Sequence, residues 1–203
     1  MPGILKKYAV VPRRRLSQSF LADDNIARKI VAAAALQERD RVLEIGAGHG
    51  VLTRLIVPRV RMLHAVGIDR ELAAVLEREL PLPRRIRIWN EDILKFDWTV
   101  LETDSPEDRC VVVGNIPYGI ATEILFRLLE QRKLISRAIL MVQKELAERL
   151  TGRPQTKAYG VPTVLLSMHA RCERLFDVPP SCFYPVPRVV STVIALNFRA
   201  VPV

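Results

Sequence analysis

The sequence predicts an open, doubly wound α/β domain with a mostly parallel sheet. Two observations carry this prediction: apolar segments of strand type alternate with segments of helix type along most of the chain, and a glycine-rich loop joins the first strand to the next helix. Alternation of this kind produces a parallel sheet with helices on both faces. In such sheets ligands bind at the carboxyl ends of the strands. The length of 203 residues, of which 49% are hydrophobic, suits one compact domain with a substantial core.

The expected elements follow one another in a regular order. Asp23 and Asp24 are suited to cap a helix over 25–36, because Asp is a preferred N-cap residue. Apolar runs and their spacing predict the remaining elements. These are strands at 41–45, 63–68, 85–89, 110–113 and 138–142, helices at 51–57, 70–80, 122–132 and 144–150, a proline-rich loop at 176–187, and a closing strand at 191–198.

The charge of the chain points to a polyanionic partner. The formal net charge is +9, and residues 1–22 contain five basic residues and no acidic one. A basic arm on a basic domain is typical of a protein that contacts nucleic acid, whereas a membrane surface is the weaker candidate. A solvated surface that keeps the protein soluble explains the charge equally well. The five basic residues are Lys6, Lys7, Arg13, Arg14 and Arg15.

Several classes of protein are not indicated. No apolar run approaches the roughly 18 residues that a membrane-spanning helix needs, and the basic N-terminus has no apolar stretch of signal-peptide length. We therefore expect a soluble, cytoplasmic protein that does not bind a membrane and acts as a monomer. The cysteines are odd in number without CxxC spacing and the histidines are scattered, so neither disulfides nor a metal site are expected. These residues are Cys110, Cys172, Cys182, His49, His64 and His169.

The glycine loop Glu44-Ile-Gly-Ala-Gly-His-Gly50 is the first motif with a chemical meaning. Glycine has no Cβ and tolerates positive φ, so the backbone of such a loop can approach a ligand closely. The spacing of Gly46, Gly48 and Gly50 departs from the GxGxxG pattern of dinucleotide-binding loops and is of the methyltransferase type. A plain turn between strand and helix is the alternative interpretation.

The segment Asn115-Ile-Pro-Tyr118 is the most informative tetrapeptide, because it directly follows an expected strand. An exocyclic amino group has two N–H donors, which the side-chain oxygen of Asn115 and the backbone carbonyl of Ile116 or Pro117 can accept. The ring of Tyr118 can stack on a base. A β-turn with a buried tyrosine is the structural alternative.

Together these motifs resemble those of the ribosomal RNA adenine N6,N6-dimethyltransferases, which use S-adenosylmethionine. The resemblance implies a Rossmann-like methyltransferase domain with a mostly parallel sheet of about seven strands. It also implies ribosomal RNA or the small ribosomal subunit as the partner, with dimethylation of small-subunit RNA during ribosome assembly as the function. The matching segments are 16–21, 44–53, 91–94, 114–118, 143–145 with 147–150, 157–160, and 176–188.

The resemblance assigns seven residues to the cofactor, apart from Asn115. Three of them close over the cofactor, and two line its methionine part. One accepts a hydrogen bond from the adenine amino group of the cofactor, and the last is its neighbour in the sequence. In that order they are Gln18, Ser19 and Leu21; Gly46 and Gly48; and Asp92 with Ile93.

The resemblance also places the chemistry at the tetrapeptide. Asn115 would face both the methyl donor and the target amine, the carbonyls of Ile116 and Pro117 would assist it, and Tyr118 and Phe183 would sandwich a flipped adenine. Adenine N6 shares its lone pair with the ring, so the enzyme must align it and favour a pyramidal nitrogen. No strong general base is evident in the sequence.

Gly67 is a departure from the family pattern, which has a glutamate there for the cofactor ribose. Asp69 lies two residues further on, and side chains two apart along a strand point the same way. We therefore expect Asp69 to contact the ribose, with Gly67 leaving room for it. The alternative is that Asp69 caps the helix that begins at Arg70.

A larger departure is length, since relatives generally carry a helical C-terminal domain and none is expected here. We expect an arm with the cofactor-closing motif at 1–22 and a catalytic domain at 23–203. Two other functions stay open: methylation of large-subunit ribosomal RNA of the macrolide-resistance type, and a non-catalytic nucleic-acid-binding factor, for which Gly67 is the best support. A DNA adenine methyltransferase fits less well, because its tetrapeptide usually has two prolines after the first residue.

Overall fold

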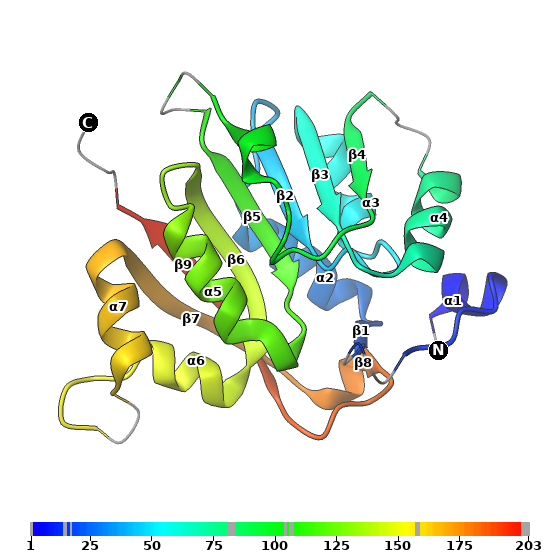
Figure 1. Cartoon of the computed structure of the whole chain (residues 1–203). Helices are drawn as coiled ribbons and strands as arrows, with labels where there is room; N and C mark the ends of the chain where they lie inside the picture. Colours follow the sequence, from blue (N-terminus) through cyan, green and yellow to red (C-terminus); the bar gives the residue numbers. More distant parts are fainter. Residues whose placement is uncertain are drawn as a thin grey trace.

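A seven-stranded sheet forms the centre of the molecule, as shown by a computed structural model (Figure 1). The structure describes residues 2–13, 16, 18–80, 84–103, 105, 108–156 and 159–199. The strands lie in the order β4-β3-β2-β5-β6-β9-β7. Their bounds are β2 Arg41–Ile45, β3 Met62–Val66, β4 Ile86–Trp89, β5 Cys110–Asn115, β6 Ile135–Gln143, β7 Ala170–Val178 and β9 Ser191–Phe198.

The sheet has a parallel and an antiparallel part. Neighbouring strands from β4 to β6 pair in parallel, whereas β9 runs antiparallel to both β6 and β7. The parallel strands β2 and β5 are almost entirely buried, and most of their residues are apolar, as expected for strands covered on both faces. The predicted fold class, a doubly wound α/β domain with a mostly parallel sheet of about seven strands, is confirmed.

Helices cover both faces of the sheet and each face has its own hydrophobic core. One core packs α5, α6 and α7 against the sheet, and the other packs α2 and α3 against the opposite face. Figure 1 shows α5, α6 and α7 together on the face toward the viewer. The helices are α2 Asp24–Ala33, α3 Thr53–Ile56, α4 Arg70–Glu79, α5 Ala121–Glu130, α6 Lys144–Leu150 and α7 Val161–His169.

An aspartate caps the N-terminus of helix α2. The carboxylate of Asp23 accepts hydrogen bonds from the backbone N–H groups of Asn25 (2.8 Å) and Ile26 (3.1 Å), and this satisfies donors that a helix N-terminus leaves free. The predicted cap at 23 is therefore confirmed, and α2 ends three residues before the expected boundary at 36.

The N-terminal arm packs on the rest of the domain. Helix α1 (Gly3–Lys7) lies beside α4, and Leu5, Val10 and Phe20 form a small core with residues of α4. The two-residue strand β1 (Phe20–Leu21) pairs antiparallel with β8 (Phe183–Tyr184), below α2 in Figure 1. The arm is thus joined both to α4 and to the proline-rich loop.

Two cations that the sequence suggests for a polyanion have acidic partners in the fold. Lys7 Nζ lies 2.5 Å from Glu79 Oε1, and Arg13 Nη2 lies 2.7 Å from Glu71 Oε1. These ion pairs fasten the arm to α4, and the expected role of the arm in contacting nucleic acid stays a prediction. Arg14 and Arg15 lie outside the described residues.

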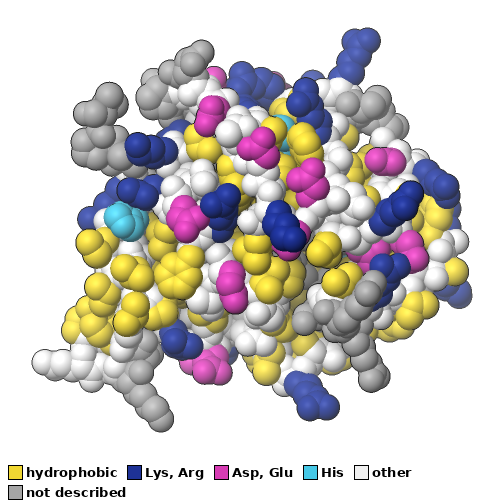
Figure 2. Space-filling model, viewed as in Figure 1, with side chains coloured by type: hydrophobic (Ala, Val, Ile, Leu, Met, Phe, Trp, Pro, Cys, Tyr) yellow, Lys and Arg dark blue, Asp and Glu magenta, His cyan; other side chains and the backbone are white. Residues whose placement is uncertain are grey.

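Helix α7 and strand β7 have no counterpart among the predicted elements. The outer side of α7 is apolar and accessible, with Val161 69% and Met168 59% exposed. Figure 2 shows apolar side chains gathered on the corresponding lower-left part of this face. Strand β7 is an edge strand in which exposed charged residues interrupt the apolar pattern. Within the described ranges, no helix combines the length and hydropathy that crossing a bilayer requires.

Candidate active site

A cavity of about 300 Å³ opens at the carboxyl ends of β2, β3, β4 and β5. This is the edge of the sheet where the sequence predicts a ligand site. The arm, the glycine loop, the start of α4 and the tetrapeptide after β5 surround it. The lining residues include Leu16, Gln18, Ser19, Phe20, Gly46, Gly48, Gly67, Ile68, Asp69, Leu72, Trp89, Glu91, Asp92, Ile93, Asn115, Ile116, Pro117 and Tyr118.

The glycine loop forms a wall that side chains would obstruct. Gly46 and Gly48 have φ values of +74° and +55°, a conformation that L-residues with a Cβ rarely adopt. A Cβ on Gly46 would lie 3.1 Å from the backbone oxygen of Asn115, and one on Gly48 would lie 3.2 Å from the ring of Phe20. The loop therefore brings bare backbone to the cavity, as the spacing of the glycines predicts.

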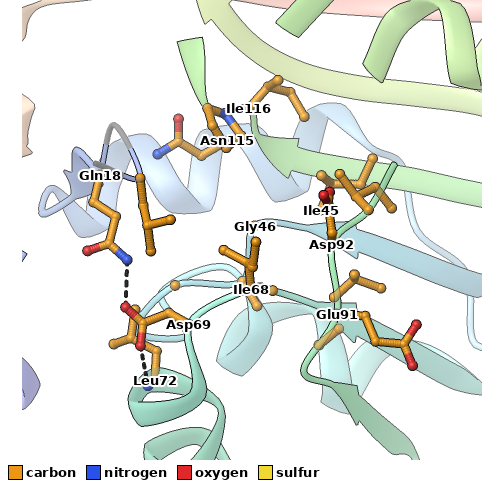
Figure 3. A pocket seen from close by; sticks show the side chains of 18 of the residues that line it. Gln18, Ile45, Gly46, Ile68, Asp69, Leu72, Glu91, Asp92, Asn115 and Ile116 are labelled. Atoms are coloured by element: carbon orange, nitrogen blue, oxygen red, sulfur yellow. Dashed lines mark hydrogen bonds between the residues drawn. The ribbon is translucent and has the colours of Figure 1, made fainter. Parts of the chain in front are cut away.

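Asp69 connects the arm to α4 across one side of the cavity. Its Oδ1 accepts from the backbone N–H groups of Glu71 and Leu72, so it is the N-cap of α4. Gln18 Nε2 donates to its Oδ2 at 2.8 Å, as Figure 3 shows. Strand β3 ends at Val66, so Gly67 and Asp69 lie beyond it and strand alternation does not apply to them. The alternative interpretation of Asp69, as a helix cap, is confirmed by this geometry.

The turn after β4 supplies carboxylates to another wall. Asp92 Oδ1 accepts from the backbone N–H of Leu94 at 3.0 Å, which fixes the head of the turn. No described residue donates to the other oxygen of Asp92. Figure 3 places Asp69 and Asp92 on either side of Gly46. On one side of the cavity, both carboxylate oxygens of Asp69 accept hydrogen bonds. On the other side, one carboxylate oxygen of Asp92 has no donor among the described residues.

The amide of Asn115 has a defined orientation. Its Nδ2 donates to the backbone oxygen of Ser19 at 3.0 Å, and no described residue donates to its Oδ1. The backbone N–H of Ile116 donates to Met141 of β6, and the hydroxyl of Ser19 donates to the backbone oxygen of Pro185. The arm and the proline-rich loop therefore hold the amide of Asn115 with one acceptor oxygen unused.

Tyr118 begins a short 3-10 helix, Tyr118–Ile120, at the mouth of the cavity. Its hydroxyl lies 2.6 Å from Ser191 Oγ in a hydrogen bond. Burial raises the pKa of Tyr118 above its ordinary value, so the phenol stays neutral at physiological pH. The ring is half-buried and one part of it remains accessible from the cavity.

Two residues expected at the site do not line the cavity. Leu21 and Phe183 are 1% and 2% exposed, and both belong to the core that lies against α2. They are directly paired in the register of β1 and β8, and both side chains pack into the same core. The described conformation therefore brings Tyr118 to the cavity without Phe183.

Ionisable groups are buried around the glycine loop. Burial raises the pKa of the Glu44 carboxyl to about 7 and lowers the pKa of His49 to about 4. Glu44 Oε2, His49 Nε2 and Thr53 Oγ1 have no hydrogen-bond partner among the described residues. Burial disfavours the charged form of each group, so His49 is neutral at physiological pH, whereas Glu44 is about half protonated near pH 7.

Sequence reasoning missed several lining residues. Trp89 ends β4, and its indole N–H donates to His64 Nδ1 at 3.3 Å. Its place at the carboxyl end of a parallel strand is a signal that could have identified it. Ile68 and Leu72 lie before and within α4 and follow the same rule. Ser191, which contacts Tyr118 without lining the cavity, has no local signal, because the two residues are 73 positions apart.

Comparisons with known proteins agree on one family. Residues 11–203 match the family described as "Ribosomal RNA adenine dimethylase". The chain is 44% identical to the ribosomal RNA small subunit methyltransferase A of Syntrophus aciditrophicus, over 95% of this chain and 69% of that protein. It is 42% identical to the protein of the same name from Methylococcus capsulatus, over 95% and 74%.

Solved structures give the same result. A dimethyladenosine transferase from Plasmodium falciparum superimposes with a TM-score of 0.78 at 30% identity, covering 89% of this chain and 63% of that one. The 23S rRNA methyltransferase ErmE superimposes with a TM-score of 0.74 at 31% identity, covering 90% and 71%. The predicted family and enzyme class are confirmed: the chain belongs to the ribosomal RNA adenine dimethylase family.

Proposed function

We propose that this protein transfers methyl groups from S-adenosylmethionine to N6 of adenine in small-subunit ribosomal RNA. The observation that carries the proposal is the amide of Asn115 at the end of β5. Its nitrogen is held by Ser19, and its oxygen is left without a described donor beside a cavity lined by the glycine loop. That oxygen is the kind of acceptor that an exocyclic amine requires.

The residues of the cavity fit the cofactor. The bare backbone at Gly46 and Gly48 leaves space that a Cβ would fill, and it suits the methionine part. The open oxygen of Asp92 can accept from an adenine amino group, next to Ile93. Gln18 closes the cavity from the arm side. When bound, S-adenosylmethionine supplies an electrophilic methyl group.

Asn115 aligns and activates the target amine in this proposal. N6 of adenine is a weak nucleophile because its lone pair is delocalised into the ring. Hydrogen bonds from N6 to Asn115 Oδ1 and to a carbonyl of the Ile116-Pro117 turn favour a pyramidal nitrogen whose lone pair points at the methyl group. Fixing this geometry before the reaction removes an entropic part of the barrier.

The target base stacks on Tyr118 in this proposal. A flipped adenine needs an aromatic face to offset the cost of leaving its helix, and base–aromatic stacking contributes about 1–3 kcal/mol. The second face, expected from Phe183, requires that ring to leave the core in which the structure places it. Stacking on Tyr118 alone needs no such change.

The ribose contact of Asp69 stays a prediction. Oδ1 of Asp69 caps α4 and Oδ2 accepts from Gln18, so a ribose hydroxyl would have to share or replace the Gln18 amide. Asp69→Ala should then weaken cofactor binding by about tenfold, the loss of one hydrogen bond to a charged acceptor. Unchanged affinity, measured by calorimetry, would leave Asp69 with the capping role alone.

The test is methyl transfer from labelled S-adenosylmethionine to unmethylated small subunits and, separately, to protein-free large-subunit RNA. The modified nucleoside is identified by mass spectrometry, with Asn115→Ala as the control. Dimethyladenosine in the small subunit, lost in the variant, supports the proposal. The likeness to ErmE makes large-subunit RNA the second candidate, supported by label in that RNA alone. RNA binding without any methyl transfer would support a non-catalytic factor instead.

A further inference from the structure

We propose that Ser191 is a positioning residue that fixes the ring plane of Tyr118 for the target base. The inference rests on the proposed function, since it gives a role to the face on which the base would stack. Its starting observation is the 2.6 Å hydrogen bond between Tyr118 Oη and Ser191 Oγ, which joins the cavity to a buried strand of the sheet.

The hydrogen bond crosses the end of one strand. Tyr118 follows β5, whereas Ser191 is the first residue of β9, and β6 lies between these strands. Neighbouring strands are about 4.8 Å apart, so the side chains of Tyr118 and Ser191, joined by their hydrogen bond, together bridge a distance on the order of 10 Å over the end of β6. The length of a tyrosine suits this span, and a shorter side chain would not reach Ser191.

The anchor at Ser191 is rigid. Its residue is 0% exposed, and it pairs with Gln143 of β6 and with Val178 of β7. The backbone and Cβ of a serine on a strand that is paired on both sides cannot move without disturbing two ladders. Ser191 therefore offers a fixed point, in contrast to an exposed serine on a loop.

The other end of the Tyr118 side chain is fixed as well. Ile116 N–H donates to the Met141 oxygen at 3.0 Å, and Ile120 N–H donates to the Pro117 oxygen at 3.2 Å. With the backbone held by these bonds and the phenol oxygen held by Ser191, both ends of the side chain are restrained. The ring is then presented to the cavity in one orientation, and less entropy is lost when a base stacks on it.

The test compares Ser191→Ala, Tyr118→Phe and the double variant in steady-state methylation of RNA at saturating cofactor. Each single variant should lower kcat/KM for RNA by about tenfold, since small misplacements of reacting groups are costly. The double variant should be no worse than either single one, because both remove the same hydrogen bond. The affinity for cofactor, measured by calorimetry, should stay within about twofold of the wild type.

Thr192→Val is the matched control. It removes a buried hydroxyl from the next residue of β9, where Thr192 Oγ1 donates to Asp177 and contacts no residue of the cavity. A general weakening of β9 would affect this variant as much as Ser191→Ala, whereas loss of a positioning contact would affect only the latter.

The inference is overturned if Ser191→Ala keeps wild-type kcat/KM, or if the effects of the two single changes multiply in the double variant. A wild-type protein without any methyl transfer would contradict the proposed function instead. In that case a crystal structure of Ser191→Ala still decides the positioning role: more than one orientation of the Tyr118 ring supports it, and one unchanged orientation overturns it.

Discussion

The buried polar side chains around β4, β3, β2 and β5, which form one half of the sheet, are mostly ionisable. Those around β6, β9, β7 and α7 are hydroxyls. The first group contains Glu44, His49, Thr53, His64 and Asp69, and the second contains Thr163, Ser191 and Thr192. The cavity opens only toward the first half among the described residues. The two halves therefore contribute different things to one site.

Topology explains the division. In the parallel half each strand is followed by a loop that leaves the sheet at the same edge, so several loops meet there and enclose a cavity. In the antiparallel half, β9 lies between β6 and β7 and runs opposite to both. The described loops of this half therefore do not meet at one edge and enclose a cavity, and β9 instead contacts Tyr118 through Ser191. In the proposed function the first half accordingly binds the cofactor, and the second half holds Tyr118 through Ser191.

The largest effect is expected where the two halves meet, at Asn115. Asn115→Ala removes the acceptor that the proposed function assigns to the target amine, and methyl transfer should fall by about a hundredfold or more. The rate is measured with labelled cofactor under single-turnover conditions. Asn197→Ala, an exposed asparagine on β9, is the control and should keep the wild-type rate. A rate for Asn115→Ala close to that of the control would contradict the assignment.

The glycine loop should be a sensitive backbone segment of the parallel half. Gly46→Ala combines a φ of +74° with a Cβ 3.1 Å from the Asn115 oxygen, so we expect a loss of about 1–2 kcal/mol in unfolding free energy. Gly67→Ala is the matched change, because its Cβ would meet nothing within 4 Å and its effect should stay within about 0.5 kcal/mol. Denaturant unfolding measures the free-energy loss in both variants, and equal losses would contradict this prediction.

The parallel half of the sheet could be predicted from the sequence, whereas parts of the antiparallel half and the contacts between distant residues could not. Strands β2 and β5 consist mainly of buried apolar residues, and the glycine loop follows β2 directly, so the parallel half and its cavity could be predicted. Strand β7 is an edge strand with exposed charges, which hides its period. Pairs such as Arg13 with Glu71, or Tyr118 with Ser191, join residues far apart in the sequence, and no local pattern reveals them.

The ionisable groups of the parallel half should make stability depend on pH. The pKa of Glu44 is raised from 4.5 to about 7, so the folded state holds a proton that the unfolded state releases. Its favourable contribution is complete below pH 4.5 and is lost as the pH rises through 7. Relative to Glu44→Gln, the wild type should lose about 3 kcal/mol of unfolding free energy over this range.

Denaturant unfolding of both proteins at several pH values measures this difference. His49 and His64, whose pKa values are lowered to about 4, have the opposite effect, since they cost stability as the pH falls from 6.5 to 4. They are present in both proteins and therefore cancel in the difference. A difference that does not change with pH would show that Glu44 is ionised in the fold.

The smallest effect is expected at the arm. Glu79 accepts from Lys7 and from Tyr8, and the pairs lie at the surface, where salt screens them. Glu79→Gln should lower the melting temperature slightly at low ionic strength and not at high ionic strength. Differential scanning calorimetry at two salt concentrations checks this, with Glu77→Gln on the same helix as the control. A loss that persists at high salt would show that the contact is not mainly electrostatic.

The most direct test of the division of labour measures two quantities on two variants. Asp92→Ala changes the cofactor wall of the parallel half, and Ser191→Ala changes the support in the antiparallel half. Calorimetry gives the cofactor Kd, and steady-state kinetics at saturating cofactor gives kcat/KM for RNA. We expect Asp92→Ala to raise the Kd by about tenfold and Ser191→Ala to lower kcat/KM by about tenfold with an unchanged Kd. If Ser191→Ala raises the cofactor Kd as much as Asp92→Ala does, the two halves do not act separately.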